Sequence, residues 1–190
     1  DNPVHDGMSL YSVGWLLGGK AGPEGLEFPE GATWDIGFLD PEMAKRLVAG
    51  VVSGPEVFAG MAVTEARLIT PPSFEGEARM VPSSPILVRT QTPGGGKRYL
   101  EWSDPKADET LTRSVQGRLR AAGLDGPDAE IKASFDRTDP RARTKLVTYK
   151  RIRHMGNMCA VRFEGAPIAH KVLWTVGVGS LTGSGFGALR

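Results

Sequence analysis

The first part of the chain alternates between β-favouring apolar runs and one stretch with the period of a helix. In that stretch Met43, Leu47 and Val51 recur at helical spacing, and a preceding Asp-Pro pair is suited to cap a helix that ends near Gly54. The predicted elements are, in order, strands at Leu10–Leu17 and Ala32–Leu39, a helix at Asp40–Gly54 and a strand at Val57–Ile69.

The second part of the chain carries a denser series of elements. Leu111, Val115 and Leu119 form one apolar stripe after another Asp-Pro pair, which predicts a helix at Asp104–Ala122. The other predicted elements are strands at Ile86–Thr90, Tyr99–Trp102, Glu130–Phe135, Lys145–Ile152 and Met158–Phe163, a short helix at Pro167–Val176 and a last strand at Gly185–Leu189.

This order of elements predicts an α+β fold of tandem ferredoxin-like (RRM-like) units. We place the first unit at residues 1–82 and the second at residues 83–190. The first unit lacks an opening strand and helix in this pattern. Since the chain also starts at Asp1 rather than at methionine, we expect it to be part of a longer protein.

The formal net charge is only +1, but positive charge is concentrated in one segment. Seven Lys and Arg residues lie between Arg137 and Arg153, where Asp139 is the single acidic residue. Such a segment is typical of a contact with a polyanion, because neutralising phosphates releases counterions. It is equally typical of the solvated face of a hairpin.

Other features restrict the class of protein. The single cysteine, Cys159, cannot close an intrachain disulfide, and the longest apolar candidate for a membrane span is broken by Gly54, Pro55 and Glu56. We therefore expect a protein of a reducing cytoplasm without a membrane partner. No group of His, Cys, Asp and Glu has the spacing of zinc ligands, so we expect neither a metal site nor a cofactor.

The sharpest motif is the glycine-rich segment Gly177–Gly187, which has five glycines in eleven residues and hydroxyls at Ser180 and Thr182. Glycines permit positive φ and close approach, so successive amides can point at phosphate oxygens of a polyphosphate or an RNA backbone. A Walker A loop is excluded because no Gly-Lys-Ser/Thr occurs, and a dinucleotide loop is disfavoured because no βαβ unit follows.

Here the sequence resembles the RNA-processing branch of the repeat-associated (RAMP) superfamily of CRISPR proteins. The terminal loop of that family has the form Gly-x-Gly, a spacer and Gly-Phe-Gly, which Gly177-Val178-Gly179 and Gly185-Phe186-Gly187 match. Two weaker segments, Cys159–Pro167 and Ser84–Val88, extend the likeness, so that it covers residues 10–190. The resemblance implies a prokaryotic protein with two adjoining ferredoxin-like units and RNA along the cleft between them.

The resemblance also implies an activity, the cleavage of CRISPR repeat transcripts to guide RNA by a metal-independent endoribonuclease. A ribose 2′-hydroxyl attacks the adjacent phosphate, which leaves a cyclic phosphate and a 5′-hydroxyl, and the protein then stays bound to the repeat end. Such a reaction needs a proton acceptor, a proton donor and positive charge near the phosphate. His5 lies just before the first strand, where many family members place a catalytic histidine, and is the candidate acid or base. The alternative is an exposed terminal histidine.

The chain has two further histidines. We expect His154 at the tip of a basic hairpin that includes Lys150–Asn157, where it contacts RNA backbone or faces solvent. His170 shares a helix face with Trp174 and could stack on a base or lie at a contact between units. We favour the structural role for His170.

The residues expected to bind RNA are basic side chains from two elements together with the glycine-rich segment. The hairpin could enter the groove of an RNA stem or track its phosphates, and the long helix could contribute in the same way. The candidates are Arg113, Arg120, Lys145, Lys150, Arg151, Arg153, His154, Gly177, Gly179, Ser180, Thr182, Gly183, Gly185 and Gly187.

Two other functions stay open at this point. The first is a non-catalytic subunit of a CRISPR effector complex, which binds guide RNA and other subunits without cleaving. The second is an RNA-binding module outside CRISPR systems. RRM modules carry a Lys/Arg-Gly-Phe/Tyr-Gly/Ala-Phe-Val run of stacking aromatics, and the absence of such a run in this sequence disfavours the second alternative.

Overall fold

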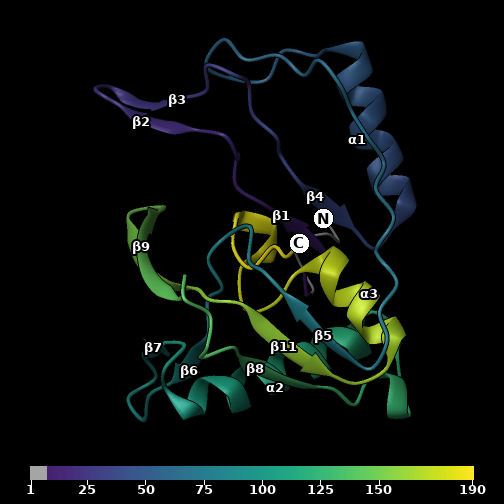
Figure 1. Ribbon diagram of the computed structural model, residues 1–190, viewed down its shortest axis with the longest axis vertical. Helices are drawn as coiled ribbons and strands as arrows, with labels where there is room; N and C mark the ends of the chain where they lie inside the picture. The colour runs from purple at the N-terminus through teal and green to yellow at the C-terminus, as the bar shows by residue number, and fades with distance from the viewer. Residues whose placement is uncertain (1–7) are drawn as a thin grey trace.

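The computed structural model describes residues 8–190 and has the α+β fold that the sequence predicts (Figure 1). Within these residues, three α-helices and two short 3₁₀ turns connect several small antiparallel sheets. In chain order the elements are β1 (Tyr11–Val13), β2 (Lys20–Gly22), β3 (Gly25–Glu27), β4 (Ile36–Phe38), α1 (Pro41–Ser53), β5 (Glu77–Met80), β6 (Arg89–Gln91), β7 (Lys97–Tyr99), α2 (Pro105–Ala121), η1 (Gly126–Asp128), β8 (Lys132–Phe135), β9 (Arg143–Tyr149), β10 (Ile152–Met158), β11 (Val161–Glu164), α3 (Pro167–Val176) and η2 (Thr182–Ser184).

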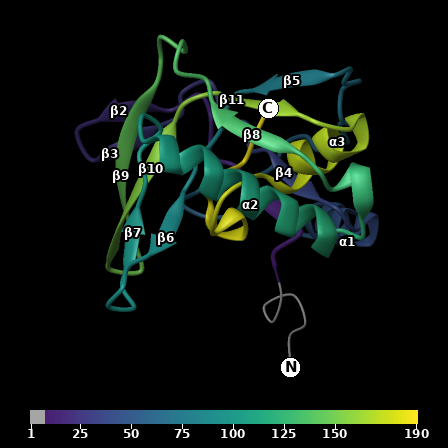
Figure 2. The same cartoon turned by 90° about the horizontal axis from the view of Figure 1, so that it is seen from below.

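A three-stranded antiparallel sheet in the order β5-β11-β8 forms the centre of the C-terminal part. The inward side chains of its strands, among them Met80, Phe135 and Phe163, are buried. They belong to one core with the apolar stripes of α2 and α3. Figure 2 shows both helices on the same side of this sheet, and no helix of residues 8–190 covers its other face.

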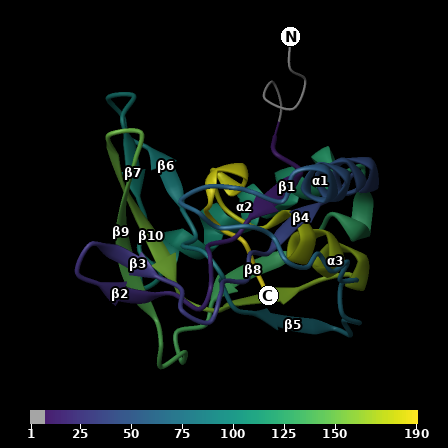
Figure 3. The same ribbon diagram turned by 90° about the horizontal axis from the view of Figure 1, so that it is seen from above.

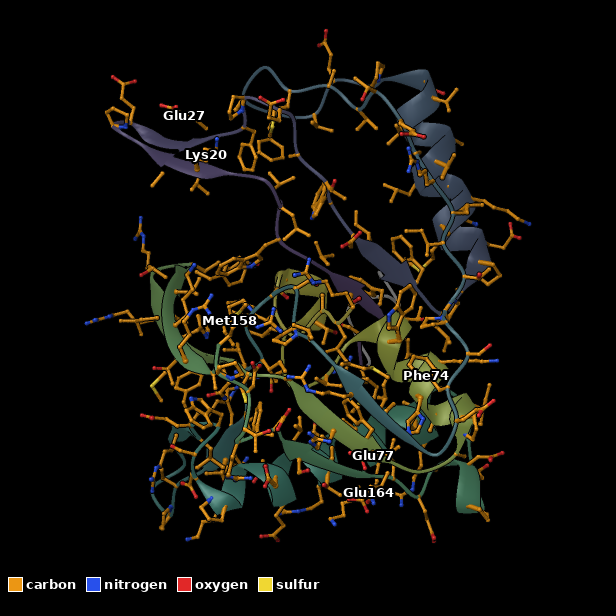
Figure 4. The ribbon with its side chains drawn as sticks, in the orientation of Figure 1. Lys20, Glu27, Phe74, Glu77, Met158 and Glu164 are labelled. Carbon is orange, nitrogen blue, oxygen red and sulfur yellow. The ribbon has the colours of Figure 1, made fainter. Side chains whose placement is uncertain are left out.

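The N-terminal part docks on this body through a small two-stranded sheet. Strand β1 pairs with β4 in antiparallel register, with Tyr11 opposite Phe38. The Ser12 hydroxyl donates to the carbonyl of Thr175 in α3 at 2.8 Å, and this bond ties the two parts together. The β2–β3 hairpin and α1 extend beyond the sheet (Figures 1 and 3), and Figure 4 shows the cross-strand residues Lys20 and Glu27 on that hairpin.

The three predicted helices are confirmed, together with the caps of the first two. The Asp40 carboxylate accepts from the amide of Glu42 at 2.9 Å, and Asp104 accepts from the amide of Lys106 at 2.9 Å. Each cap is followed by a proline in the first turn, where no amide hydrogen is needed. Within residues 8–190, no helix is long and apolar enough to cross a bilayer.

Two strand predictions are corrected, and three strands were not expected. The segment Val57–Ile69 forms a turn closed by a bridge between Glu56 and Ala62, and Leu68 beyond it is 82% exposed and unpaired within the described chain. The expected last strand is reduced to a single bridge between Leu189 and Pro82. Conversely, β2, β3 and β5 were not expected. β5 precedes the predicted boundary at residues 82 and 83 yet pairs with β11, and the boundary itself stays a prediction.

A buried carboxylate directly after β8 pairs with arginines of β5 and β11. The Asp136 carboxylate accepts from Arg79 Nε at 2.6 Å and from the hydroxyl of Thr138 at 2.6 Å. Arg162 adds a longer contact of 3.4 Å from β11. The bond from Thr138, followed by the one from Arg79, holds the pKa of Asp136 well below its ordinary value of 3.8. Asp136 therefore connects the central sheet to the segment that leads into β9.

We expect Asp136→Asn to lower the free energy of unfolding at pH 7 by roughly 2 kcal/mol, because two arginines lose a charged acceptor. An acid with a lowered folded pKa stabilises the fold above its unfolded pKa, and that contribution is lost as pH falls. The difference in free energy of unfolding between the variant and the natural chain should therefore become smaller below pH 3.8. Urea denaturation at several pH values measures it, with Asp128→Asn at an exposed site as control. A difference independent of pH would contradict this account.

Candidate functional site

The glycine-rich segment is packed into the body of the protein rather than held out as a loop. The amide of Val178 donates to the carbonyl of Gly187 at 2.8 Å, and the amide of Gly187 donates to Pro85 at 2.9 Å. Ser180 donates through its amide to Leu87 at 3.0 Å. These amides are therefore engaged by the protein's own carbonyls.

The candidate residues of this segment fall into two groups. Gly177, Gly179, Thr182 and Gly187 are buried. Ser180, Gly183 and Gly185 are half-buried, and the last two lie beside Ser184 on the wall of a cavity. The RNA-binding role of the whole set stays a prediction, and the half-buried stretch around Ser184 is the part that a ligand in the cavity can reach.

Arg118 of α2 holds the glycine-rich segment in place. Its guanidinium donates to the carbonyl of Gly179 at 2.7 Å, to the hydroxyl of Thr182 at 2.8 Å and to the carbonyl of Ser9 at 2.8 Å. A fourth, longer bond of 3.3 Å reaches the carbonyl of Val176. Burial lowers the pKa of Arg118 to about 10, and no carboxylate pairs with it within residues 8–190. The sequence analysis missed Arg118, although it continues the helical spacing of Leu111 and Val115.

The basic hairpin β9–β10 divides its candidate residues between two faces. Tyr149 pairs with Ile152, and Lys145 shares their face because side chains alternate along a strand. Arg153 pairs with Thr148 and lies on the opposite face. Lys150 and Arg151 form the turn, with φ of 48° and 63°. The predicted basic segment is thus exposed as a ridge, not as one flat surface.

The expected position of His154 at the hairpin tip is wrong. His154 lies inside β10 opposite Val147 and is 4% exposed. Its Nδ1 is 2.7 Å from the hydroxyl of Tyr99, while Nε2 is buried without a partner among residues 8–190. Its ring packs near Tyr149 and Phe186, at centroid distances of 6.2 and 5.5 Å. The turn of the hairpin lies earlier in the chain than expected, at Lys150 and Arg151. A role of His154 in RNA binding stays a prediction.

The favoured structural role of His170 agrees with its place in the fold. The ring is fully buried between Phe74 and Phe163, at centroid distances of 5.7 and 6.4 Å. Figure 4 shows Phe74 beside α3, which carries His170. Burial lowers the pKa of His170, which favours the neutral ring.

The two candidate arginines of α2 are both exposed. Arg113 pairs with Glu109 one turn earlier at 3.0 Å, and Arg120 follows two positions after the buried Arg118. Gln116, which lies between them along the helix, donates to the carbonyl of Ile131 at 3.0 Å. His5, the candidate catalytic residue, lies outside the described residues.

A cavity of about 760 Å³ lies where the N-terminal part meets the hairpin and the glycine-rich segment. Aromatic side chains from separate segments line it, and the sequence analysis missed them. They are Trp15, Phe28, Trp34, Phe58 and Tyr149. Within residues 8–190, no three His, Cys, Asp or Glu side chains lie together as metal ligands would.

Comparison with known families shows to which family the chain belongs. The family model described as CRISPR associated protein Cas6, C-terminal, matches residues 69–190. This chain belongs to the Cas6 family. Membership connects it to CRISPR repeat RNA processing and supports an RNA-cleaving enzyme. The resemblance noted on the glycine-rich segment is thereby confirmed.

Solved structures support the same fold. One, described as the product of a Cas6-related gene from Pyrococcus furiosus, has a TM-score of 0.81 at 19% identity and covers 95% of this chain and 77% of its own. A RAMP protein binding different RNA substrates has a TM-score of 0.80 at 19% identity, and the match covers 95% of this chain and 78% of that protein. A Cas6 product complex has a TM-score of 0.62 at 16% identity, and the match covers 98% of this chain and 84% of that protein. A search of curated proteins found no match. At these identities the likeness establishes the ferredoxin-like Cas6/RAMP fold.

Proposed function

We propose that this Cas6 protein is a metal-independent endoribonuclease that cleaves CRISPR repeat transcripts and stays bound to the repeat end. The observation that carries the proposal is a basic hairpin beside an accessible stretch of the glycine-rich segment, in a chain of the Cas6 family. Of the solved structures that share its fold, one is described as binding different RNA substrates and another as a product complex, which fits an RNA ligand.

The proposed reaction moves one proton at each end of an in-line displacement. The ribose 2′-hydroxyl loses its proton and forms a new bond to phosphorus. The bond from phosphorus to the 5′ oxygen breaks, and the leaving oxygen takes a proton, so a cyclic phosphate and a 5′-hydroxyl result. His5 is the proposed acid or base, because an imidazole exchanges protons near neutral pH.

Binding is proposed to depend on the exposed cations of two elements. Lys145, Lys150 and Arg151 would neutralise phosphates along the hairpin, and Arg153 would act from its other face. Arg113 and Arg120 would contribute from α2. Each phosphate contact should steepen the dependence of affinity on salt, because bound counterions are released.

The test is incubation of end-labelled repeat RNA with the protein in EDTA, beside a His5→Ala variant. We expect one cut with a cyclic phosphate end, slowed at least 100-fold in the variant while binding persists. Activity that requires an added divalent cation would contradict metal independence. Unchanged cleavage by the variant would remove His5 from the mechanism.

The alternative is a non-catalytic subunit that holds the repeat-derived end of guide RNA in an effector complex. Its favouring observation is that Arg118 and the internal amide bonds give the buried half of the glycine-rich segment a packing role. Under this alternative, the unmodified protein binds repeat RNA and leaves it uncut.

A further inference from the structure

The aromatic cavity has features of a preformed binding site. Trp15 donates through Nε1 to the carbonyl of Gly185 at 2.7 Å, and Trp34 donates to the carbonyl of Gly14 at 2.9 Å. Both indole rings are therefore fixed before any ligand arrives, which reduces the entropy lost on binding.

The hairpin supplies positive charge at one wall of the cavity. Lys145 Nζ lies 4.6 Å from the centroid of the Trp15 ring, and Lys150 Nζ lies 5.4 Å from that of Tyr149. A hydrogen bond with the Ser184 hydroxyl, assisted by Lys150, lowers the pKa of Tyr149 below its ordinary value. Aromatic faces, ammonium groups and hydroxyls thus meet at the end of the glycine-rich segment.

The β2–β3 hairpin, which supplies other lining residues, carries negative charge beside the cavity. The β2–β3 hairpin and the residues after it carry exposed Glu24, Glu27 and Glu30, and the same part of the chain supplies Leu26 and Phe28 to the cavity. Figures 1 and 2 show this hairpin and β9 on the same side of the molecule. A polyanion at the cavity would keep its phosphates on the β9 wall, away from these carboxylates, and direct its uncharged groups inwards.

We propose that this cavity takes unstacked nucleobases from a single-stranded stretch of the RNA, with the adjoining phosphates along β9. The inference rests on the proposed function and adds a subsite to it. Stacking on aromatic side chains tolerates any base sequence, whereas the basic wall requires a phosphate backbone. The volume of about 760 Å³ lies within the range of pockets that enclose small ligands.

The test compares single-stranded repeat RNA with an abasic strand of equal length, by fluorescence anisotropy. Trp15→Ala should raise Kd for the RNA about tenfold, which corresponds to loss of one stacked base, and leave Kd for the abasic strand unchanged. Lys145→Ala should weaken both ligands and reduce the salt dependence of binding. Lys132→Ala on β8 is the matched control, and Trp15→Phe, which keeps a stacking ring, should restore part of the affinity.

The outcomes separate this inference from the proposed function. If the natural chain cleaves repeat RNA and Trp15→Ala binds it equally well, the subsite is wrong and the function stands. Equal weakening towards RNA and abasic strand by Trp15→Ala would also overturn the subsite, since it indicates a structural defect. A changed oligomeric state with unchanged RNA affinity would indicate a protein occupant instead. A natural chain that binds no repeat RNA would overturn both proposals.

Discussion

A Gly187→Ala variant is expected to unfold at much lower urea concentration than the natural chain. Gly187 has a φ of +66°, and a Cβ there would overlap the carbonyl of Val178. Its own backbone is bonded on both sides, to Pro85 and to Val178, so it cannot move away without breaking these bonds. The left-handed backbone and the overlap together should lower the free energy of unfolding by roughly 3 kcal/mol.

The matched control is Gly95→Ala in the β6–β7 turn. Gly95 also has a positive φ, of +76°, but a Cβ there meets nothing within 4 Å. The Gly95→Ala variant should therefore lose only about 1 kcal/mol of free energy of unfolding, from the left-handed backbone conformation alone. Equal losses of stability in the two variants would show that the backbone around Gly187 moves easily to admit a Cβ. That result would contradict the close packing of the glycine-rich segment.

The helices could be predicted because their signals are local. Asp40 and Asp104 cap α1 and α2, and the period of apolar residues that follows each cap lies within one stretch of sequence. Strand β5 gives no such signal, because its four residues are specified by a partner, β11, that lies far along the chain. The β2–β3 hairpin is similar, since Gly22 and Gly25 on either side of its turn are typical of any loop.

The glycine-rich segment shows how one pattern admits two explanations. Glycines are needed where a backbone approaches a phosphate, and equally where it approaches another part of the protein. At Gly179 the close neighbour is the carbonyl of Leu87, 2.7 Å from where a Cβ would lie. The sequence identified the segment, but only the structure distinguishes its packed glycines from the accessible stretch at Ser184.

The aromatic cavity could not be predicted from the sequence. Its aromatic residues have no regular spacing in the sequence, and they meet only because the N-terminal part docks beside the hairpin. They are Trp15, Phe28, Trp34, Phe58 and Tyr149. The basic hairpin was visible as a charged segment. Its division into two faces required the pairing register, because a shift of one residue exchanges the faces of a strand.

Arg118→Met is expected to have an effect as large as that of Gly187→Ala, for an electrostatic reason. The change leaves the carbonyls of Ser9 and Gly179 and the hydroxyl of Thr182 without their donor at a site where Arg118 is 4% exposed. Loss of several charged hydrogen bonds should lower the free energy of unfolding by roughly 3 kcal/mol or more. Because these groups join α2 to the glycine-rich segment, cleavage of repeat RNA should also be lost.

Arg118→Lys tests whether the shape of the guanidinium is needed in addition to its charge. An ammonium group cannot reach acceptors that lie on two sides of a planar fork, so this variant should recover only part of the stability. Arg120→Met, at an exposed position of the same helix, should change stability by less than about 0.5 kcal/mol. Urea denaturation measures stability, and hydrogen exchange at Val178 and Ser180 follows the segment itself. If Arg118→Met matches the natural chain in both measurements, the guanidinium does not hold the glycine-rich segment in place.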